Sequence, residues 1–162
     1  MSQRDELFNL ATELWQQAYE HQKNGDLDEA IHLYEESIEV LPTAEAHTFL
    51  GWAFSFQGKL EEAIEECHKA IQVDADFGNP YNDIGAYLIQ LGKPDEAIAW
   101  LELAIEARRY ESYCYPHMNL GRVYEMKGEW GKALSEYRKA VECRADYADA
   151  KHALQRLQAR MN

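Results

Sequence analysis

Apolar and polar residues follow one another along this chain in an order that occurs four times. In each copy a glycine is followed five positions later by alanine, and the alanine is followed at once by isoleucine or leucine. The four glycines are Gly25, Gly58, Gly92 and Gly128, so the copies are 33, 34 and 36 residues apart. A nearly constant period of this size predicts a repeat protein, in which each copy is one small structural unit.

The residues before each glycine predict a first helix. Eight and seven positions before the glycine, three copies carry a branched apolar residue followed by a second glycine. Those pairs are Leu50-Gly51, Ile84-Gly85 and Leu120-Gly121. Together with a further residue four positions before the turn glycine, they form one stripe at helical spacing. A glycine inside a helix costs about 1 kcal/mol relative to alanine, so we expect another helix to pack closely against it.

The residues after each glycine predict a second helix. Its first apolar positions are the four alanines at Ala30, Ala63, Ala97 and Ala133, and later small and apolar residues continue the same face. The turn glycine itself suits the left-handed conformation that ends a helix. Each copy is therefore predicted to be a helix–turn–helix hairpin, which cannot bury its apolar face alone and must stack on its neighbours.

These residues resemble the tetratricopeptide repeat (TPR), a 34-residue unit with a W-x2-L-G-x2-Y first helix and an Ala-x3-Phe second helix. The chain departs from that pattern where His47 and His117 replace Trp, where Gln17-Ala18 replaces Leu-Gly, and where only Pro42 keeps the closing proline. The resemblance implies an all-α fold, a right-handed superhelix (α-solenoid), as a single domain over 1–162. The expected repeats are 11–43, 44–77, 78–113 and 114–147, with a capping helix at 148–162 and a longer link at 108–113.

The composition restricts the expected cellular location and argues against disulfides and a zinc site. Hydrophobic residues make up 46% of the chain and its mean hydropathy is −0.57, and no apolar run approaches the ~18 residues of a membrane helix. The N-terminus lacks a signal-peptide pattern, so we expect a cytoplasmic protein. Three cysteines without CxxC spacing argue against a disulfide framework or a zinc site. Cys67 and Cys143 occupy positions that are apolar in other repeats, so both are expected in the core.

The charge is large and uneven. The formal net charge is −13, which opposes RNA binding of the kind that pentatricopeptide repeats perform, and also opposes binding to anionic lipid. Residues 1–107 hold five basic and 22 acidic residues (−17), whereas 108–162 hold eleven and seven (+4). The asymmetry is either a solvated acidic surface or a means of orienting a partner.

No pattern of catalytic or cofactor-binding residues is present. The six histidines form no HExxH motif, and GxxxxGK[ST], GxGxxG and GxSxG are all missing. His21, His47 and His117 fall in core positions of the repeat, where a satisfied, partly buried histidine is expected. The glutamates of the second helices, such as Glu61 and Glu62, fall on a solvated face. We therefore expect no enzymatic activity, no metal and no cofactor.

The resemblance implies that the first helices line a concave groove that holds a peptide or a helix of a partner. The inward positions of these helices give a set of candidate partner-binding residues. They are Trp15, Tyr19, Thr48, Trp52, Phe56, Asn82, Ile89, Tyr115, Met118, Arg122, His152 and Arg156. Aromatic residues dominate one end and arginines the other, which predicts a partner with apolar anchors and an acidic end.

Two alternatives to a peptide-binding adaptor stay open. In the first, the aromatic residues of the expected groove are buried against residues 2–10; in the second, they are buried against a second copy in a self-associating scaffold. Some TPR proteins grip the C-terminal carboxylate of chaperones with Lys, Asn and Arg side chains. The matching positions here are mostly aromatic or acidic, including Trp15, Tyr19 and Asp83, so this clamp is disfavoured.

Overall fold

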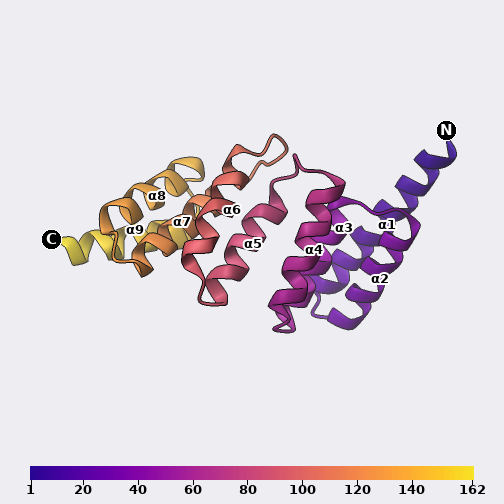
Figure 1. The fold of residues 1–162 in the computed structure, drawn as a ribbon, viewed down its shortest axis with the longest axis horizontal. Helices are drawn as coiled ribbons and strands as arrows, with labels where there is room; N and C mark the ends of the chain where they lie inside the picture. The colour runs from indigo at the N-terminus through magenta and orange to yellow at the C-terminus, as the bar shows by residue number, and fades with distance from the viewer.

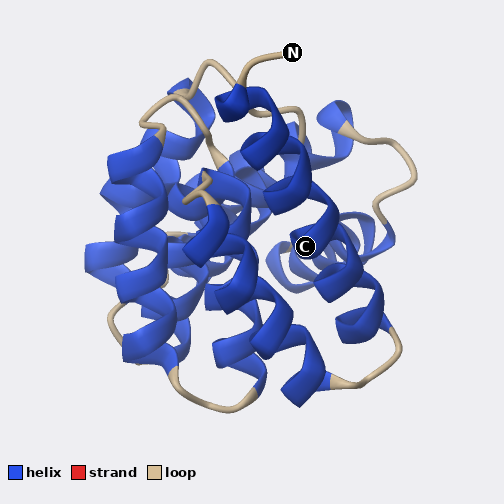
Figure 2. Ribbon diagram, turned by 90° about the vertical axis from the view of Figure 1, so that its right-hand side faces the viewer, coloured by secondary structure: helices blue, strands red, loops and turns tan.

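The computed structural model describes residues 1–162, and apart from one isolated bridge between Phe77 and Arg109 its regular structure is helical. Figure 1 shows the helices following one another along a single elongated stack, and Figure 2, a view from the N-terminal end, shows only helices and loops. This confirms the predicted all-α solenoid. The helices are α1 (Gln3–Lys23), α2 (Leu27–Val40), α3 (Ala44–Phe56), α4 (Leu60–Val73), α5 (Asn79–Gln90), α6 (Pro94–Glu106), α7 (Cys114–Met126), α8 (Trp130–Cys143) and α9 (Ala148–Met161).

The four repeated glycines make the turns inside the four hairpins. Their φ angles are +84°, +76°, +76° and +74° at Gly25, Gly58, Gly92 and Gly128, and no other residue has a positive φ. Side chains with a Cβ adopt this left-handed region at a cost, so glycine ends each first helix and lets the chain reverse. The hairpins are α1–α2, α3–α4, α5–α6 and α7–α8, as the period predicts.

The glycines within the first helices bring the two helices of a hairpin together. A Cβ added at Gly85 would lie 2.5 Å from Leu101, and one at Gly121 would lie 2.3 Å from the ring of Tyr137. Ala97 and Ala133, on the facing helices, are fully buried. The close approach expected from sequence is therefore present, and it explains why small residues occupy these positions.

Neighbouring hairpins share one core, and the two ends of the stack are closed differently. Leu50, Ile84 and Leu120 are at most 4% exposed because the preceding hairpin covers them. The equivalent residue of α1, Gln17, is exposed, since no hairpin precedes it. At the other end α9 packs on the last hairpin, with Leu157 buried in the core. The departure at Gln17 is thus a polar cap, and the predicted C-terminal helix is confirmed.

Two hairpins replace the expected tryptophan contact by a histidine–glutamate hydrogen bond between their helices. His47 lies 2.7 Å from Glu66, and His117 lies 2.7 Å from Glu136 at the same place two hairpins further on. Burial raises the pKa of Glu66, but hydrogen bonds from His47 and from a lysine outweigh it, so the pKa falls below its usual value. Both histidines are therefore satisfied within the fold, as predicted, whereas His21 is half-exposed beside Asp26.

Other expectations are confirmed or corrected at the ends of helices. Cys143 is exposed, not buried as predicted, because it is the last residue of α8.

The link at 107–113 folds back over earlier hairpins: the Arg109 guanidinium donates to Asp74 at 2.8 Å and to Glu45 at 2.7 Å. It also lies 4.2 Å from the centre of the Phe77 ring.

We expect Ala97→Leu to lower the free energy of unfolding by ~1–3 kcal/mol, because the added atoms enter a fully packed helix contact. Ala99→Leu, which adds the same atoms at an exposed position of α6, is the matched control and should change stability by less than about 0.5 kcal/mol. Urea unfolding followed by circular dichroism measures both. Equal effects at the two positions would contradict the close packing.

Candidate functional site

The first helices form the inner side of the stack. Besides their hairpin partners, α1 and α3, α3 and α5, and α5 and α7 contact one another. Second helices lie between neighbouring hairpins and make no comparable set of contacts among themselves. Elements on the inside of a curve are closer together than those on the outside, so the first helices line the concave face. This is the face on which the candidate residues were predicted.

A row of aromatic rings crosses this face from α1 to the end of α3. Trp15 stacks on Phe49 at 5.4 Å between ring centres, and Tyr19 lies 5.4 Å from the same ring. Tyr19 then approaches Trp52 at 6.2 Å, and Trp52 meets Phe56 edge-on at 5.2 Å. We call these five residues the aromatic row. Phe56 is 63% exposed, so the row ends in an uncovered apolar ring.

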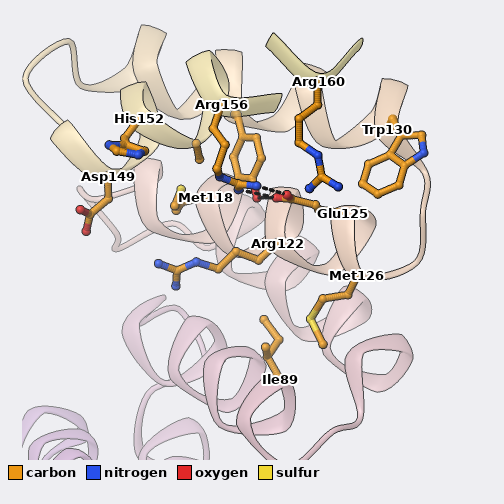
Figure 3. Close-up of a pocket in the computed structure, with 12 residues that line it drawn as sticks. Ile89, Met118, Arg122, Glu125, Met126, Trp130, Asp149, His152, Arg156 and Arg160 are labelled. Carbon is orange, nitrogen blue, oxygen red and sulfur yellow. Dashed lines mark hydrogen bonds and ion pairs between the residues drawn. The ribbon is translucent and has the colours of Figure 1, made fainter. Parts of the chain in front are cut away.

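A second feature, the C-terminal pocket, lies where α5, α7, α8 and α9 meet, and has a volume of about 810 Å³ (Figure 3). Five of the predicted groove residues line it, namely Ile89, Met118, Arg122, His152 and Arg156. Glu125 and Met126 also line it, and they occupy inward positions of the same repeat pattern although they were not among the candidate residues. The sequence did not indicate Trp130, Asp149 and Arg160. The pocket thus combines apolar walls with four basic side chains and two carboxylates.

Arg122 and Arg156, two arginines of the C-terminal pocket, differ in their hydrogen-bond partners. Arg156 donates to both oxygens of Glu125, at 2.5 and 2.9 Å, and the Tyr137 hydroxyl donates to the same carboxylate at 2.6 Å. Arg156 and then Tyr137 hold the pKa of Glu125 below its usual value. Arg122 donates only to the Asn119 side-chain oxygen, at 3.2 Å, and in Figure 3 it extends into the pocket away from Glu125. Arg122 is the arginine best placed to meet an incoming anion.

Three predicted groove residues make contacts within the fold, and two of them, Thr48 and Asn82, are buried. Thr48 is 1% exposed, and its hydroxyl donates to the backbone oxygen of Ala44. Asn82 is 8% exposed and accepts a hydrogen bond from Asn119 at 3.0 Å. Tyr115 lies at the start of α7 and packs edge-on against Tyr147 at 5.5 Å. The successive first helices are close enough to cover positions that a single-helix pattern places on the inner face.

Two residues at positions that match the chaperone-tail clamp, but that were not among the candidate residues, also belong to this face. Phe49 and Asp83 occupy the same repeat position, nine residues before their turn glycine. Phe49 joins Trp15 to Tyr19 in the aromatic row. Burial raises the pKa of Asp83 to about 7, although a hydrogen bond with Asn82 acts in the opposite direction. Asp83 belongs to α5, the first helix between the aromatic row and the C-terminal pocket.

No group of three or more His, Cys, Asp or Glu side chains is arranged to hold a metal ion. None of the nine helices combines the length and the apolar character that crossing a membrane requires.

The sequence matches models of a known repeat family. Two models described as tetratricopeptide repeat match residues 16–80 and 76–146, which together cover most of the chain. The chain therefore belongs to the tetratricopeptide repeat family.

Individual relatives share the repeat but are longer. A TPR repeat-containing thioredoxin, TTL4, of Arabidopsis thaliana is 24% identical over 131 residues, which are 76% of this chain and 19% of the relative. The small glutamine-rich tetratricopeptide repeat-containing protein 2 of Saccharomyces cerevisiae is 32% identical over 89 residues. These are 54% of this chain and 26% of the yeast protein. The chain thus spans about a fifth to a quarter of these relatives.

Solved structures agree on the fold. The pilF protein of Pseudomonas aeruginosa superposes with a TM-score of 0.88 at 21% identity, over 99% of this chain and 71% of that one. The first TPR of Spaghetti (RPAP3), bound to an HSP90 peptide, gives a TM-score of 0.66 at 19% identity. That match covers 73% of this chain and 92% of the other.

Asp83 predicts a pH-dependent stability. Its folded pKa lies above the unfolded value of about 3.9, so the folded state loses stability as the pH rises from about 4 to about 7. We expect Asp83→Asn to raise the free energy of unfolding by about 1 kcal/mol or more at pH 8, and by little at pH 4.

The exposed Asp76 provides the control, since Asp76→Asn should have a small effect at both pH values. Urea unfolding at pH 4 and pH 8 measures the difference. An Asp83→Asn effect that is the same at both pH values would show that the carboxyl ionises normally in the folded protein.

Proposed function

We propose that this chain is a non-catalytic adaptor that binds a segment of a partner protein along its concave face. The observation that carries this proposal is the aromatic row, which runs over two first helices and ends in the uncovered Phe56. Tryptophan and tyrosine supply much of the binding energy at protein interfaces, because they bury a large area and lose little conformational freedom. The apolar side chains of the partner would lie against Trp52 and Phe56.

The charge of the chain supports a fixed direction for the bound segment. The C-terminal pocket presents Arg122 without a carboxylate partner, whereas the part of the chain before residue 108 carries a net charge of −17. An acidic residue or a C-terminal carboxylate of the partner would be attracted to Arg122 and repelled from the other end. Arg156 would contribute less to this attraction, because Glu125 already holds it.

Related proteins support peptide binding by this fold. The first TPR of Spaghetti (RPAP3) was solved with an HSP90 peptide bound. The matching inward positions here hold aromatic and acidic side chains in place of Lys, Asn and Arg, so the same peptide is not the ligand that we propose.

We also propose the cytoplasm as the place of action, because the three cysteines form no disulfide and free thiols are typical of reducing compartments.

A self-associating scaffold is the second candidate, and one observation favours it. Helix α1 has 21 residues, whereas the other helices have 12 to 14, and its N-terminal end projects beyond the rest of the stack (Figure 1). Leu7, Phe8 and Leu10 on this end are 38%, 51% and 46% exposed. Exposed apolar residues on a free helix end are suited to packing against a second copy.

Trp52→Ala should weaken binding of a partner captured from the native cell by about 2 kcal/mol, because Trp52 lies in the middle of the aromatic row. Trp100→Ala, which removes an indole from the second helix α6, should leave the affinity unchanged. Isothermal titration calorimetry measures both, at a temperature at which both variants are folded.

Light scattering over a concentration series separates the two candidates. If Trp52→Ala converts a dimer to a monomer, the row is a self-association surface and the adaptor proposal is wrong. If it mainly lowers the melting temperature and leaves the affinity intact, Trp52 belongs to the core.

Arg122→Glu should slow association with the same partner about tenfold at low salt and reduce the salt dependence of the rate. The exposed Arg138 on α8 offers a control with the same charge reversal, and Arg138→Glu should have a much smaller effect. Stopped-flow fluorescence at several salt concentrations gives the rates. Equal slowing by the two variants would mean that only the net charge matters and that the bound segment has no direction set by Arg122.

A further inference from the structure

A depression of about 750 Å³ lies at the N-terminal end of the concave face, beside the start of the aromatic row. Its lining comes from α1, except for one ring of α3. The lining residues are Glu13, Trp15, Gln16, Gln17, Tyr19, Glu20 and Phe49. Three aromatic rings therefore adjoin two carboxylates and two amides, a combination that the peptide-binding proposal above does not use.

The arrangement along α1 brings the two kinds of group together. Glu13 and Glu20 are seven residues apart, which is two helical turns, so they lie on the same face of the helix. Trp15 and Tyr19 are four apart and share another face, held in place by their contacts with Phe49. Both glutamates are exposed, and both rings are partly buried. Tyr19 lies about 100° around the helix from Glu20, so a group that contacts its ring from solvent is near the flexible Glu20 carboxylate, whereas Glu13 lines the more distant edge of the depression.

The protein already contains a cation in such a position. The Lys23 ammonium lies 4.9 Å from the centre of the Tyr19 ring and 2.8 Å from a carboxylate oxygen of Glu20. Its side chain is 45% exposed, so it makes these two contacts from the solvent side. Lys23 shows that an aromatic face and a carboxylate of α1 accept one cation together, which is the contact that an incoming basic side chain would make.

We propose that this depression, the cation subsite, binds the guanidinium group of an arginine of the partner protein. A guanidinium is planar and wide, so it stacks on the Tyr19 and Trp15 rings, which Phe49 joins, while its N–H groups donate to Glu20 at the same end of the depression, and Glu13 adds negative charge at the other edge. An ammonium makes only one of these contacts well at a time, because it is compact and more strongly hydrated. The net charge of −17 on residues 1–107 adds a general attraction for a basic group at this end.

This inference rests on the proposed function and makes the partner more specific. A segment lying along the concave face would place an arginine against α1, apolar residues against Trp52 and Phe56, and an acidic residue near Arg122. Such a segment carries opposite charges at its two ends, and the reversed orientation would bring like charges together at both. Like-charge contacts at both ends would make the complementary orientation the favoured one.

The test uses a small probe, so it requires no knowledge of the partner. N-acetyl-arginine N-methylamide is titrated into the full chain, and the indole N–H signals are followed by NMR. The neutral isostere N-acetyl-citrulline N-methylamide is the matched control ligand. We expect a saturable shift of the Trp15 signal with the arginine probe, little shift with the citrulline probe, and no shift of Trp100 on α6. The variant Trp15→Phe assigns the signal.

Two pairs of variants separate the subsite from general electrostatics. Glu13→Gln combined with Glu20→Gln should weaken binding of the arginine probe about fivefold, whereas Glu61→Gln with Glu62→Gln, two exposed residues of α4, should leave it nearly unchanged. Lys23→Gln should tighten binding about twofold by removing the internal competitor, and the exposed Lys93 supplies its control as Lys93→Gln. Equal effects of the site and control variants would overturn the proposal.

The outcomes also distinguish this inference from the proposed function. If the arginine probe leaves the Trp15 signal unmoved, or the citrulline probe moves it equally, the cation subsite does not exist. The adaptor proposal would still hold in that case, provided that Trp52→Ala weakens partner binding. If instead the probe binds as expected and Trp52→Ala has no effect on the partner, the subsite is real and the groove proposal fails.

Discussion

The close contact between the two helices of each hairpin is the constraint on which the rest of this structure depends. It requires a small residue on the first helix, because at positions 51, 85 and 121 a Cβ would collide with the facing helix, whose Leu101 and Tyr137 side chains pack directly on Gly85 and Gly121. Because the distance within each hairpin is fixed in this way, successive hairpins stack with a regular offset and their apolar faces merge into one core. The first helices then meet on the inner side, where their remaining side chains are free for binding.

The chemistry of the inner face changes along the stack while the backbone repeats. Aromatic rings occupy the first two hairpins, and arginines and methionines occupy the last hairpin and the capping helix. In a repeat protein each hairpin contributes one strip of such a surface, so a different side chain at the same repeat position changes the surface without altering the fold. A single set of packing residues therefore supports a surface with two chemically distinct ends.

The repeat period predicted the hairpins, the turn glycines and the capping helix, because each depends on small or apolar residues at fixed spacing. The details of the inner face were less predictable. Thr48 and Asn82 lie at inward positions of single helices but are both buried in the stack, Asn82 beneath Asn119 of the next first helix, and only the stacked structure shows this. The pairing of Arg156 with Glu125 joins residues 31 positions apart on different helices, so no local pattern indicates it. Cys143 was misplaced because a repeat alignment ignores where a helix ends.

The fold-back of the link at 107–113 has a consequence for the mechanics of the stack. Arg109, between the third and fourth hairpins, is tied to Asp74 and to Glu45 of the second hairpin. In a solenoid whose units contact only their neighbours, each interface between two units can bend independently, and the terminal units can unfold one at a time. The contacts of Arg109 join residues on both sides of the third hairpin, so they restrain bending between the second and third hairpins, which should move as one rigid unit. The hairpin α1–α2 lies outside this tie, so bending at its contact with the second hairpin would move Trp15 and Tyr19 relative to the three rings of the aromatic row on α3.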